Sequence, residues 1–271
     1  MSLHARTTAF RDAGRKVLVP YLTAGYPDQA TFVRLLEAAT RAGCEIIEVG
    51  IPFSDPVADG PVIQATSEAA LRAGMTADRA IDISATHAAR SGCDIVIMSY
   101  INPLLPRGIA SFAARAADAG LSGVILPDVP FEEAGPARTI LAEHGLDLID
   151  LVAPTSGTDR IAAIAGTARG FLYLVSLTGV TGGTLDTSGG VLDFVRDVKQ
   201  RTSTPCYVGF GVSSPDQAAA LGREADGVIV GSALLRLIRK SPNPDTAVAV
   251  AERFLTEMNA ALDGAGGKDD R

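Results

Sequence analysis

Glu48 is the residue of this sequence whose type and position most strongly indicate chemistry. It lies near the end of the apolar run EIIEVG (45–50), which predicts a strand buried on both faces of a parallel sheet. Glu48 alternates with Ile46 and Gly50, so it shares their face. An acid that faces a barrel interior loses hydration, which raises its pKa and lets it donate and accept a proton near neutral pH. Glu48 is thus a candidate general acid and base; the alternative is a structural acid bonded to backbone amides of the next loop.

Two more carboxylates follow in the loop FSDPVADGP (53–61). Asp59 lies eleven positions after Glu48, and two acids on one strand and its loop can hold different protonation states and take different roles. The alternative for Asp59 is to cap the helix that follows. Asp55 precedes a proline, which favours a simple turn role. We therefore predict Glu48 and Asp59 as the catalytic residues.

The elements that must position these acids recur along the whole chain. Eight short apolar runs each precede an amphipathic stretch, and 76–92 adds a second helix after the second run. Strands alternating with helices pair in parallel through right-handed crossovers, and eight such units predict a single-domain α/β fold, a closed (β/α)8 TIM barrel with extra helices. The barrel domain is predicted over 1–262, with a disordered Gly-rich tail over 263–271. The predicted strands are 16–24, 45–50, 94–100, 122–128, 146–154, 170–177, 205–211 and 226–234.

Glycines support both the helix ends and the choice of fold. Five of them follow helical runs, where each can adopt the left-handed conformation that ends a helix: Gly43, Gly74, Gly92, Gly120 and Gly145. An open, doubly wound sheet is the competing fold, and it would place a GxGxxG turn after the first strand. The nearest match, 209–214, lacks the third glycine and follows the seventh strand, so the barrel is favoured.

Glycine-rich turns follow the last three predicted strands, at 178–183, 209–211 and 231–232. In a barrel of this kind, functional groups lie at the carboxyl ends of the strands and in the loops that follow. Glycine permits close approach of the backbone, and a helix N-terminus offers unpaired N–H groups. Together the turns predict a phosphate site, with ordinary turn glycines as the alternative.

Apolar and aromatic residues at strand ends predict the walls of a pocket for a flat hydrophobic ligand, although barrel packing explains any single one equally well. They are Tyr21, Ile125, Val152, Tyr173 and Phe210. Tyr100 and Thr181 also lie at a strand end or in the loop that follows, so they are further candidates for substrate binding.

Composition excludes several classes of protein. A net charge of −7 without a Lys/Arg cluster argues against nucleic-acid or anionic-membrane binding. The three cysteines are far apart and lie in or beside apolar runs, which predicts reduced core thiols in a cytoplasmic protein. The three histidines are scattered, so no metal is predicted. No apolar run is long enough to span a bilayer, and the first residues do not read as a leader.

Six segments together resemble the tryptophan synthase alpha chain family. The resemblance covers nearly the whole chain and is most specific in the second predicted strand and its loop, because other phosphate-binding barrels share the glycine turns but lack that segment. The six segments are VPYLTAGYPD, EVGIPFSDPVADGPVIQ, LPDVPFEE, RGFLYLVSLTGVTGG, GFGVSSPDQ and ADGVIVGSAL.

This resemblance implies a lyase that cleaves indole-3-glycerol phosphate to indole and glyceraldehyde 3-phosphate by a retro-aldol reaction, without a cofactor in this chain. It implies that Glu48 is the general acid and base, that Asp59 contacts the indole N–H, and that Tyr173 lies beside the reacting side chain. The phosphate contacts that it implies are Gly182, Gly211, Gly231 and Ser232.

The resemblance also implies a partner, the pyridoxal-phosphate-bearing tryptophan synthase beta chain, in an α2β2 heterotetramer. The loop 53–60 would lie at that contact, and 178–183 would close over the substrate. Three alternatives stay open: a stand-alone lyase that releases indole, a catalytically silent barrel that binds a phosphorylated ligand or activates a partner, and another sugar-phosphate isomerase or epimerase. The last would leave the second-strand segment unexplained.

Overall fold

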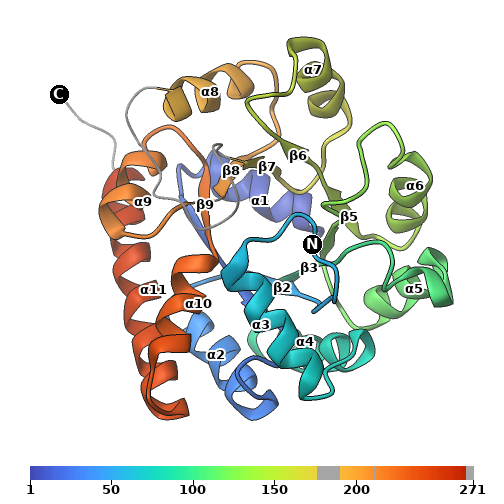
Figure 1. Ribbon diagram of the computed structural model, residues 1–271. Coiled ribbons are helices and arrows are strands. Elements are labelled where there is room, and N and C mark those ends of the chain that lie inside the picture. Colours follow the sequence, from blue (N-terminus) through green and yellow to red (C-terminus); the bar gives the residue numbers. More distant parts are fainter. Residues whose placement is uncertain (176–189, 210, 267–271) are drawn as a thin grey trace.

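The chain folds around a nine-stranded, all-parallel sheet that curls into a barrel (Figure 1). The computed structural model describes residues 1–175, 190–209 and 211–266. The strand order is β5-β4-β3-β2-β1-β9-β8-β7-β6, so each strand pairs with its neighbours in the sequence and β1 pairs with β9. The strands are β1 (Val17–Thr23), β2 (Ile46–Gly50), β3 (Asp94–Met98), β4 (Gly123–Ile125), β5 (Asp147–Ile149), β6 (Leu151–Val152), β7 (Leu172–Val175), β8 (Cys206–Gly209) and β9 (Gly227–Val230).

Apart from α1, which lies across one end of the barrel, the helices surround it (Figure 1). In the described ranges they are α1 (Leu3–Asp12), α2 (Gln29–Arg41), α3 (Pro61–Arg72), α4 (Ala77–Ser91), α5 (Ile109–Asp118), α6 (Gly135–Glu143), α7 (Thr158–Thr167), α8 (Gly190–Lys199), α9 (Pro215–Gly222), α10 (Ser232–Lys240) and α11 (Pro244–Gly266), with the short 3-10 helix η1 (Leu105–Arg107). The predicted barrel is confirmed, and so is the extra helix, α4. All five predicted helix-ending glycines have a positive φ.

The fifth predicted strand, 146–154, is divided in the structure. Asp150 separates β5 from β6: β5 pairs with β4, whereas β6 pairs with β7. The carboxylate of Asp150 accepts two hydrogen bonds from Arg138, at 2.6 and 2.9 Å, and its backbone carbonyl accepts one from the N–H of Tyr173. Covalent continuity of the chain at Asp150 therefore joins the two edges of the sheet.

Continuous burial explains why the strands read as unbroken apolar runs. Every residue of β1, β2 and β3 is buried, because side chains on one face fill the barrel and those on the other pack beneath helices. Helix starts follow local capping chemistry as well. The side chains of Asp28, Thr76 and Ser214 each accept a hydrogen bond from the backbone N–H three residues later.

Helix α1, for which the sequence analysis assigned no element, covers the amino end of the barrel. Its Leu3 and Phe10 are buried, and the Thr7 hydroxyl donates to the carbonyl of Gly170 at 2.6 Å. A Cβ at Gly170 would lie 3.2 Å from Leu3, so the absence of a side chain there lets α1 approach. One end of the barrel is thereby closed.

The C-terminal helix α11 packs against α2, α9 and α10, and it runs through Gly266. It therefore extends past residue 262, where the sequence analysis ends the barrel domain, and the first four residues of the predicted disordered tail are helical. Residues 267–271 lie outside the described part of the chain. None of the helices in 1–175, 190–209 and 211–266 is long and apolar enough to cross a membrane.

Candidate active site

A pocket opens at the carboxyl end of the strands, and it collects most of the residues predicted from the sequence. Five of its residues belong to β1, β2, β3, β7 and β9, one from each strand, and the others come from the loops and helices that follow β2, β8 and β9. Its described lining consists of Tyr21, Glu48, Asp59, Ile63, Met98, Tyr173, Gly211, Val212, Ile229, Gly231, Ser232, Ala233 and Arg236.

Glu48 is held on the inner face of β2, directly beside Tyr21 of β1 in the strand register. Its side chain is 4% exposed, and its Oε2 atom makes no hydrogen bond in the part of the chain that the structure describes. Burial raises the pKa of Glu48 to about 8, and the nearby charge of Asp59 adds to the increase. The structure gives no support to the alternative of an acid bonded to backbone amides.

Asp59 is 6% exposed and enters the same pocket from the loop after β2. It does not cap α3, because the N-cap residue is Gly60 and no side chain caps that helix. Burial raises the pKa of Asp59 to about 6, and a hydrogen bond with Tyr100 opposes that increase. The Tyr100 hydroxyl also accepts a hydrogen bond from the N–H of Ala58, at 2.9 Å, so it holds this part of the loop in place.

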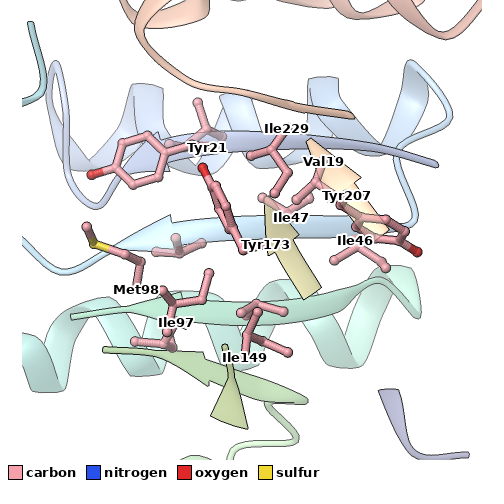
Figure 2. Close-up of a cluster of buried hydrophobic side chains, with 14 of the residues drawn as sticks. Val19, Tyr21, Ile46, Ile47, Ile97, Met98, Ile149, Tyr173, Tyr207 and Ile229 are labelled. Atoms are coloured by element: carbon pink, nitrogen blue, oxygen red, sulfur yellow. The ribbon is translucent and has the colours of Figure 1, made fainter. Parts of the chain in front are cut away.

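Two tyrosines form the inner wall beside the acids. Tyr21 and Tyr173 lie at one end of the buried cluster in Figure 2, near Met98, whereas Tyr207 and Ile46 lie at the other end. Burial raises the pKa of both Tyr21 and Tyr173 well above the ordinary value, so both hydroxyls stay protonated at neutral pH.

Two glycines make room for these rings. A Cβ at Gly50 would lie 2.1 Å from the Tyr21 hydroxyl oxygen, and one at Gly209 would lie 2.4 Å from the Tyr173 ring. Any side chain at Gly50 or Gly209 would therefore displace a tyrosine from the pocket wall.

Another part of the pocket lining is built from backbone. Gly211 follows β8 with φ +81°, a conformation that residues other than glycine rarely adopt. Gly231 is the N-cap of α10, and no side chain caps that helix. The N–H groups of the first turn, beginning at Ser232, are consequently available to a ligand, and the positive end of the helix dipole favours an anion.

The sequence-predicted residues have three outcomes in the structure. Seven line the pocket: Glu48, Asp59, Tyr21, Tyr173, Gly211, Gly231 and Ser232. Tyr100 reaches it through Asp59, whereas Ile125 is buried in β4 beside Met98 and Val152 is buried in β6; neither belongs to the lining. Thr181, Gly182 and Phe210 lie outside the described residues.

Six residues of the pocket lining were not predicted from the sequence: Ile63, Met98, Val212, Ile229, Ala233 and Arg236. Met98 and Ile229 were detectable in principle, because they lie near the ends of predicted strands on the same face as other wall residues. The others lie on helices or in a loop, where no pattern separates a side chain that faces the pocket from a neighbour that faces solvent.

The arrangement can move a proton next to an apolar, partly aromatic surface and can hold an anion at some distance from it. Two acids with pKa values near 8 and 6 can be protonated and ionised, respectively, at neutral pH. In the described ranges, no group of three or more His, Cys, Asp or Glu side chains is placed to hold a metal ion.

Comparison with known proteins identifies the family. A sequence model described as tryptophan synthase alpha chain matches residues 8–263. The chain belongs to the tryptophan synthase alpha chain family. A tryptophan synthase alpha chain from Chloroflexus aurantiacus is 44% identical over 264 residues, which cover 97% of this chain and 99% of that one. One from Geobacter sulfurreducens is 43% identical over 248 residues, covering 92% and 94%.

Solved structures of the family share this fold. The tryptophan synthase alpha subunit of Legionella pneumophila superposes with a TM-score of 0.89 at 33% identity, covering 97% of this chain and 99% of that one. A chain of Mycobacterium tuberculosis tryptophan synthase gives 0.87 at 38% identity, covering 96% and 97%. As a tryptophan synthase alpha chain, the protein acts in the biosynthesis of tryptophan.

Proposed function

We propose that this alpha chain is a carbon–carbon lyase that cleaves indole-3-glycerol phosphate to indole and glyceraldehyde 3-phosphate. One observation carries the proposal: a single pocket is lined both by two buried acids and by an uncapped helix N-terminus with a glycine turn. This polarity matches a substrate with an aromatic ring at one end and a phosphate at the other. The resemblance to the family supplies the identity of that substrate.

Glu48 carries the proton in this proposal. Its neutral carboxyl donates a proton to carbon 3 of the indole ring, and the resulting carboxylate accepts the proton of the side-chain hydroxyl next to the bond that breaks. As that O–H bond breaks, the aldehyde C=O forms, the carbon–carbon bond to the ring breaks, and its electron pair returns to the ring. Glu48 ends protonated, as it began. The raised pKa, near 8, supports this double role because a normal carboxyl would be ionised at neutral pH.

Asp59 has the complementary role. With a pKa near 6 it is mostly ionised at pH 7, so its negative charge can accept a hydrogen bond from the ring N–H and stabilise positive charge that develops on the ring nitrogen. Tyr173 would lie beside the reacting side chain, and Gly211, Gly231 and Ser232 would hold the phosphate. None of these steps needs a cofactor in this chain.

A beta chain completes the proposal, as the pyridoxal-phosphate-bearing partner in an α2β2 heterotetramer that receives the indole. Two exposed apolar side chains on loops after neighbouring strands support a contact surface: Val57 is 85% exposed and Leu105 is 54% exposed. Val57 belongs to the loop 53–60, which the resemblance to the family implies at this contact. The three free, buried cysteines are in keeping with a cytoplasmic location for the complex.

The deciding experiment incubates the purified chain with indole-3-glycerol phosphate and follows both products, first alone and then with a tryptophan synthase beta chain. We expect equimolar indole and glyceraldehyde 3-phosphate, with turnover strongly stimulated by the beta chain. Turnover of equal rate with and without the beta chain would instead indicate a stand-alone lyase. No product above background under either condition would refute the proposed reaction.

A further inference from the structure

Arg236 is a cationic side chain in the lining of the active-site pocket that the assigned chemistry does not use. It belongs to α10, is half-buried, and lines the pocket together with Gly211 and Ser232. In the described part of the chain its guanidinium makes neither an ion pair nor a hydrogen bond, although many other arginines of this protein contact a carboxylate. A half-buried arginine without a counter-charge gives up hydration with no electrostatic gain.

The position of Arg236 on α10 brings its guanidinium near the free N–H groups at the start of that helix. Ser232 is the first residue of α10, and Arg236 follows it by four residues, so the two side chains lie on one face. Helical side chains lean toward the helix N-terminus, which brings the guanidinium back toward the first turn. The first helical hydrogen bond of α10 runs from the N–H of Leu235 to the carbonyl of Gly231, at 2.9 Å, so the earlier N–H groups have no helical acceptor.

A cation at this end of a helix is electrostatically unfavourable by itself. The N-terminus carries a partial positive charge, and Arg236 adds a full positive charge near it. An anion bound between them reverses the sign of both interactions, because each positive group then faces a negative one. The wall formed by Arg236, Gly211 and the start of α10 is therefore complete only with an anion in place.

The acids of the pocket do not supply that anion. Glu48 belongs to β2 and Asp59 to the loop that follows it, and in the described residues neither acid forms an ion pair or a hydrogen bond with Arg236. Arg236 lies on α10, which follows β9, so the cation and the two acids enter the pocket from different elements of the fold. This separation fits a ligand whose negative group is distant from the part on which the acids act.

We propose that Arg236 binds the phosphate of the substrate, as a side-chain partner to the backbone N–H groups at Gly211 and at the start of α10. The identity of the substrate in this role rests on the proposed function. The binding of a phosphate monoester by Arg236 does not depend on it. A guanidinium can donate two parallel hydrogen bonds to phosphate oxygens, which an ammonium group does not reproduce. Arg236 is accordingly a binding residue, and it takes no part in proton transfer.

The test compares three variants of the full chain: R236Q, R236K and the control R239Q, which removes the same charge from an exposed position on α10. Calorimetry with glycerol 3-phosphate measures binding, and steady-state kinetics with indole-3-glycerol phosphate measures KM and kcat. We expect R236Q to raise both the Kd and the KM about 10- to 100-fold with kcat changed less than about threefold, R236K to give intermediate values, and R239Q to match the wild type.

Further readouts separate this role from a structural one. With the dephosphorylated analogue indole-3-glycerol, kcat/KM should be the same in R236Q and in the wild type. An unchanged Kd for glycerol 3-phosphate in R236Q would overturn the proposal; if R236Q does not fold, an unchanged Kd in folded R236K would do so. Binding of glycerol 3-phosphate does not require turnover. If the wild type proved inactive but bound glycerol 3-phosphate more tightly than R236Q did, the lyase function would be refuted and the role of Arg236 in phosphate binding would stand.

Discussion

The two ends of the barrel bury acidic side chains in opposite ways. At the amino end, three aspartates beside strand starts are each 6–8% exposed, and each lies against a cation. The pairs are Asp94 with Arg6 at 3.0 Å, Asp147 with Arg169 at 3.2 Å, and Asp226 with Lys199 at 2.7 Å. At the carboxyl end, Glu48 and Asp59 are buried to a similar degree, but no cation in the described residues contacts either of them.

The presence or absence of a cation partner distinguishes buried acids that stabilise the fold from buried acids that can take part in chemistry. A buried carboxylate that is paired with a cation and hydrogen-bonded keeps its charge and ties strands to helices. A buried carboxyl without a cation is held at a pKa where it can exchange a proton, and this makes the folded state less stable when the group is ionised. In this barrel Asp94, Asp147 and Asp226 at the amino end have the first arrangement, as does Asp150 with Arg138 between β5 and β6, whereas the two acids of the pocket have the second.

The largest expected effect is on turnover, and it comes from the carboxyl end. Glu48→Gln keeps the size of the side chain but removes the transferable proton, so kcat should fall by at least about 10³-fold. Binding of glycerol 3-phosphate should stay within about twofold of wild type, because the proposed phosphate contacts are Arg236, Gly211, Gly231 and Ser232 and do not include Glu48. Steady-state kinetics and calorimetry measure the two quantities. Full activity of the Glu48→Gln variant would show that Glu48 does not transfer the proton.

The same substitution should stabilise the protein at high pH. The folded pKa of Glu48, about 8, is above its ordinary value of 4.5, so the folded state holds more protons than the unfolded state between these values. The free energy of unfolding therefore falls as the pH rises from 4.5 to 8, and the loss is complete above 8. Urea unfolding should show Glu48→Gln and wild type to be equally stable near pH 4 and the variant more stable at pH 9, by on the order of 3 kcal/mol. Equal stability at pH 9 would mean that Glu48 has an ordinary pKa.

At the amino end the sign should reverse. Asp226→Asn removes the charge that faces Lys199 and weakens the hydrogen bond from the N–H of Cys206, so the variant should lose about 2 kcal/mol of stability at pH 7. Partial exposure of Lys199 keeps this loss below that of a fully buried pair. Its kcat, measured well below its melting temperature, should match wild type. A stable but inactive Asp226→Asn would contradict the division of roles between the two ends.

The pH dependence of kcat/KM should report both acids of the pocket. Asp59 must be ionised, so the rate should fall as the pH drops below about 6, and Glu48 must be protonated, so it should also fall above about 8. The profile of kcat/KM against pH should therefore be bell-shaped, and its two apparent pKa values belong to the coupled pair of acids rather than to either residue alone. A rate that stays flat from pH 5 to pH 9 would show that neither acid titrates during the reaction.

The smallest effect tests the support of Asp59. Tyr100→Phe removes a hydrogen bond that lowers the pKa of Asp59, so the acid limb of the bell should move to higher pH by about half a pH unit. The alkaline limb should stay in place. A matched Tyr207→Phe variant, which alters a buried tyrosine at the far end of the barrel cluster (Figure 2), should leave both limbs unchanged.

Much of the fold was predictable because local patterns and global topology agree. Continuous apolar runs mark strands that are buried on both faces, Ala-rich stretches mark the helices, and glycines mark their ends. The division of the fifth strand at Asp150 was not predictable, because it depends on the pairing of β5 with β4 and of β6 with β7 in the closed sheet. The closing role of α1 was not predicted, because Leu3 packs close to Gly123 and Gly170, which lie far from it in the sequence.

For the site, the sequence by itself determined which residue types could do the chemistry and where along the chain they lie. Glu48 and Asp59 stood out because an acid in an apolar strand and an acid in a short Pro/Gly loop are unusual. The tertiary structure alone decided which carboxyls stay without a cation, and that Arg236 shares a pocket with Glu48 while Arg239 does not. The physical reason is that charge interactions depend on distance and burial, which are set when segments far apart in sequence pack together.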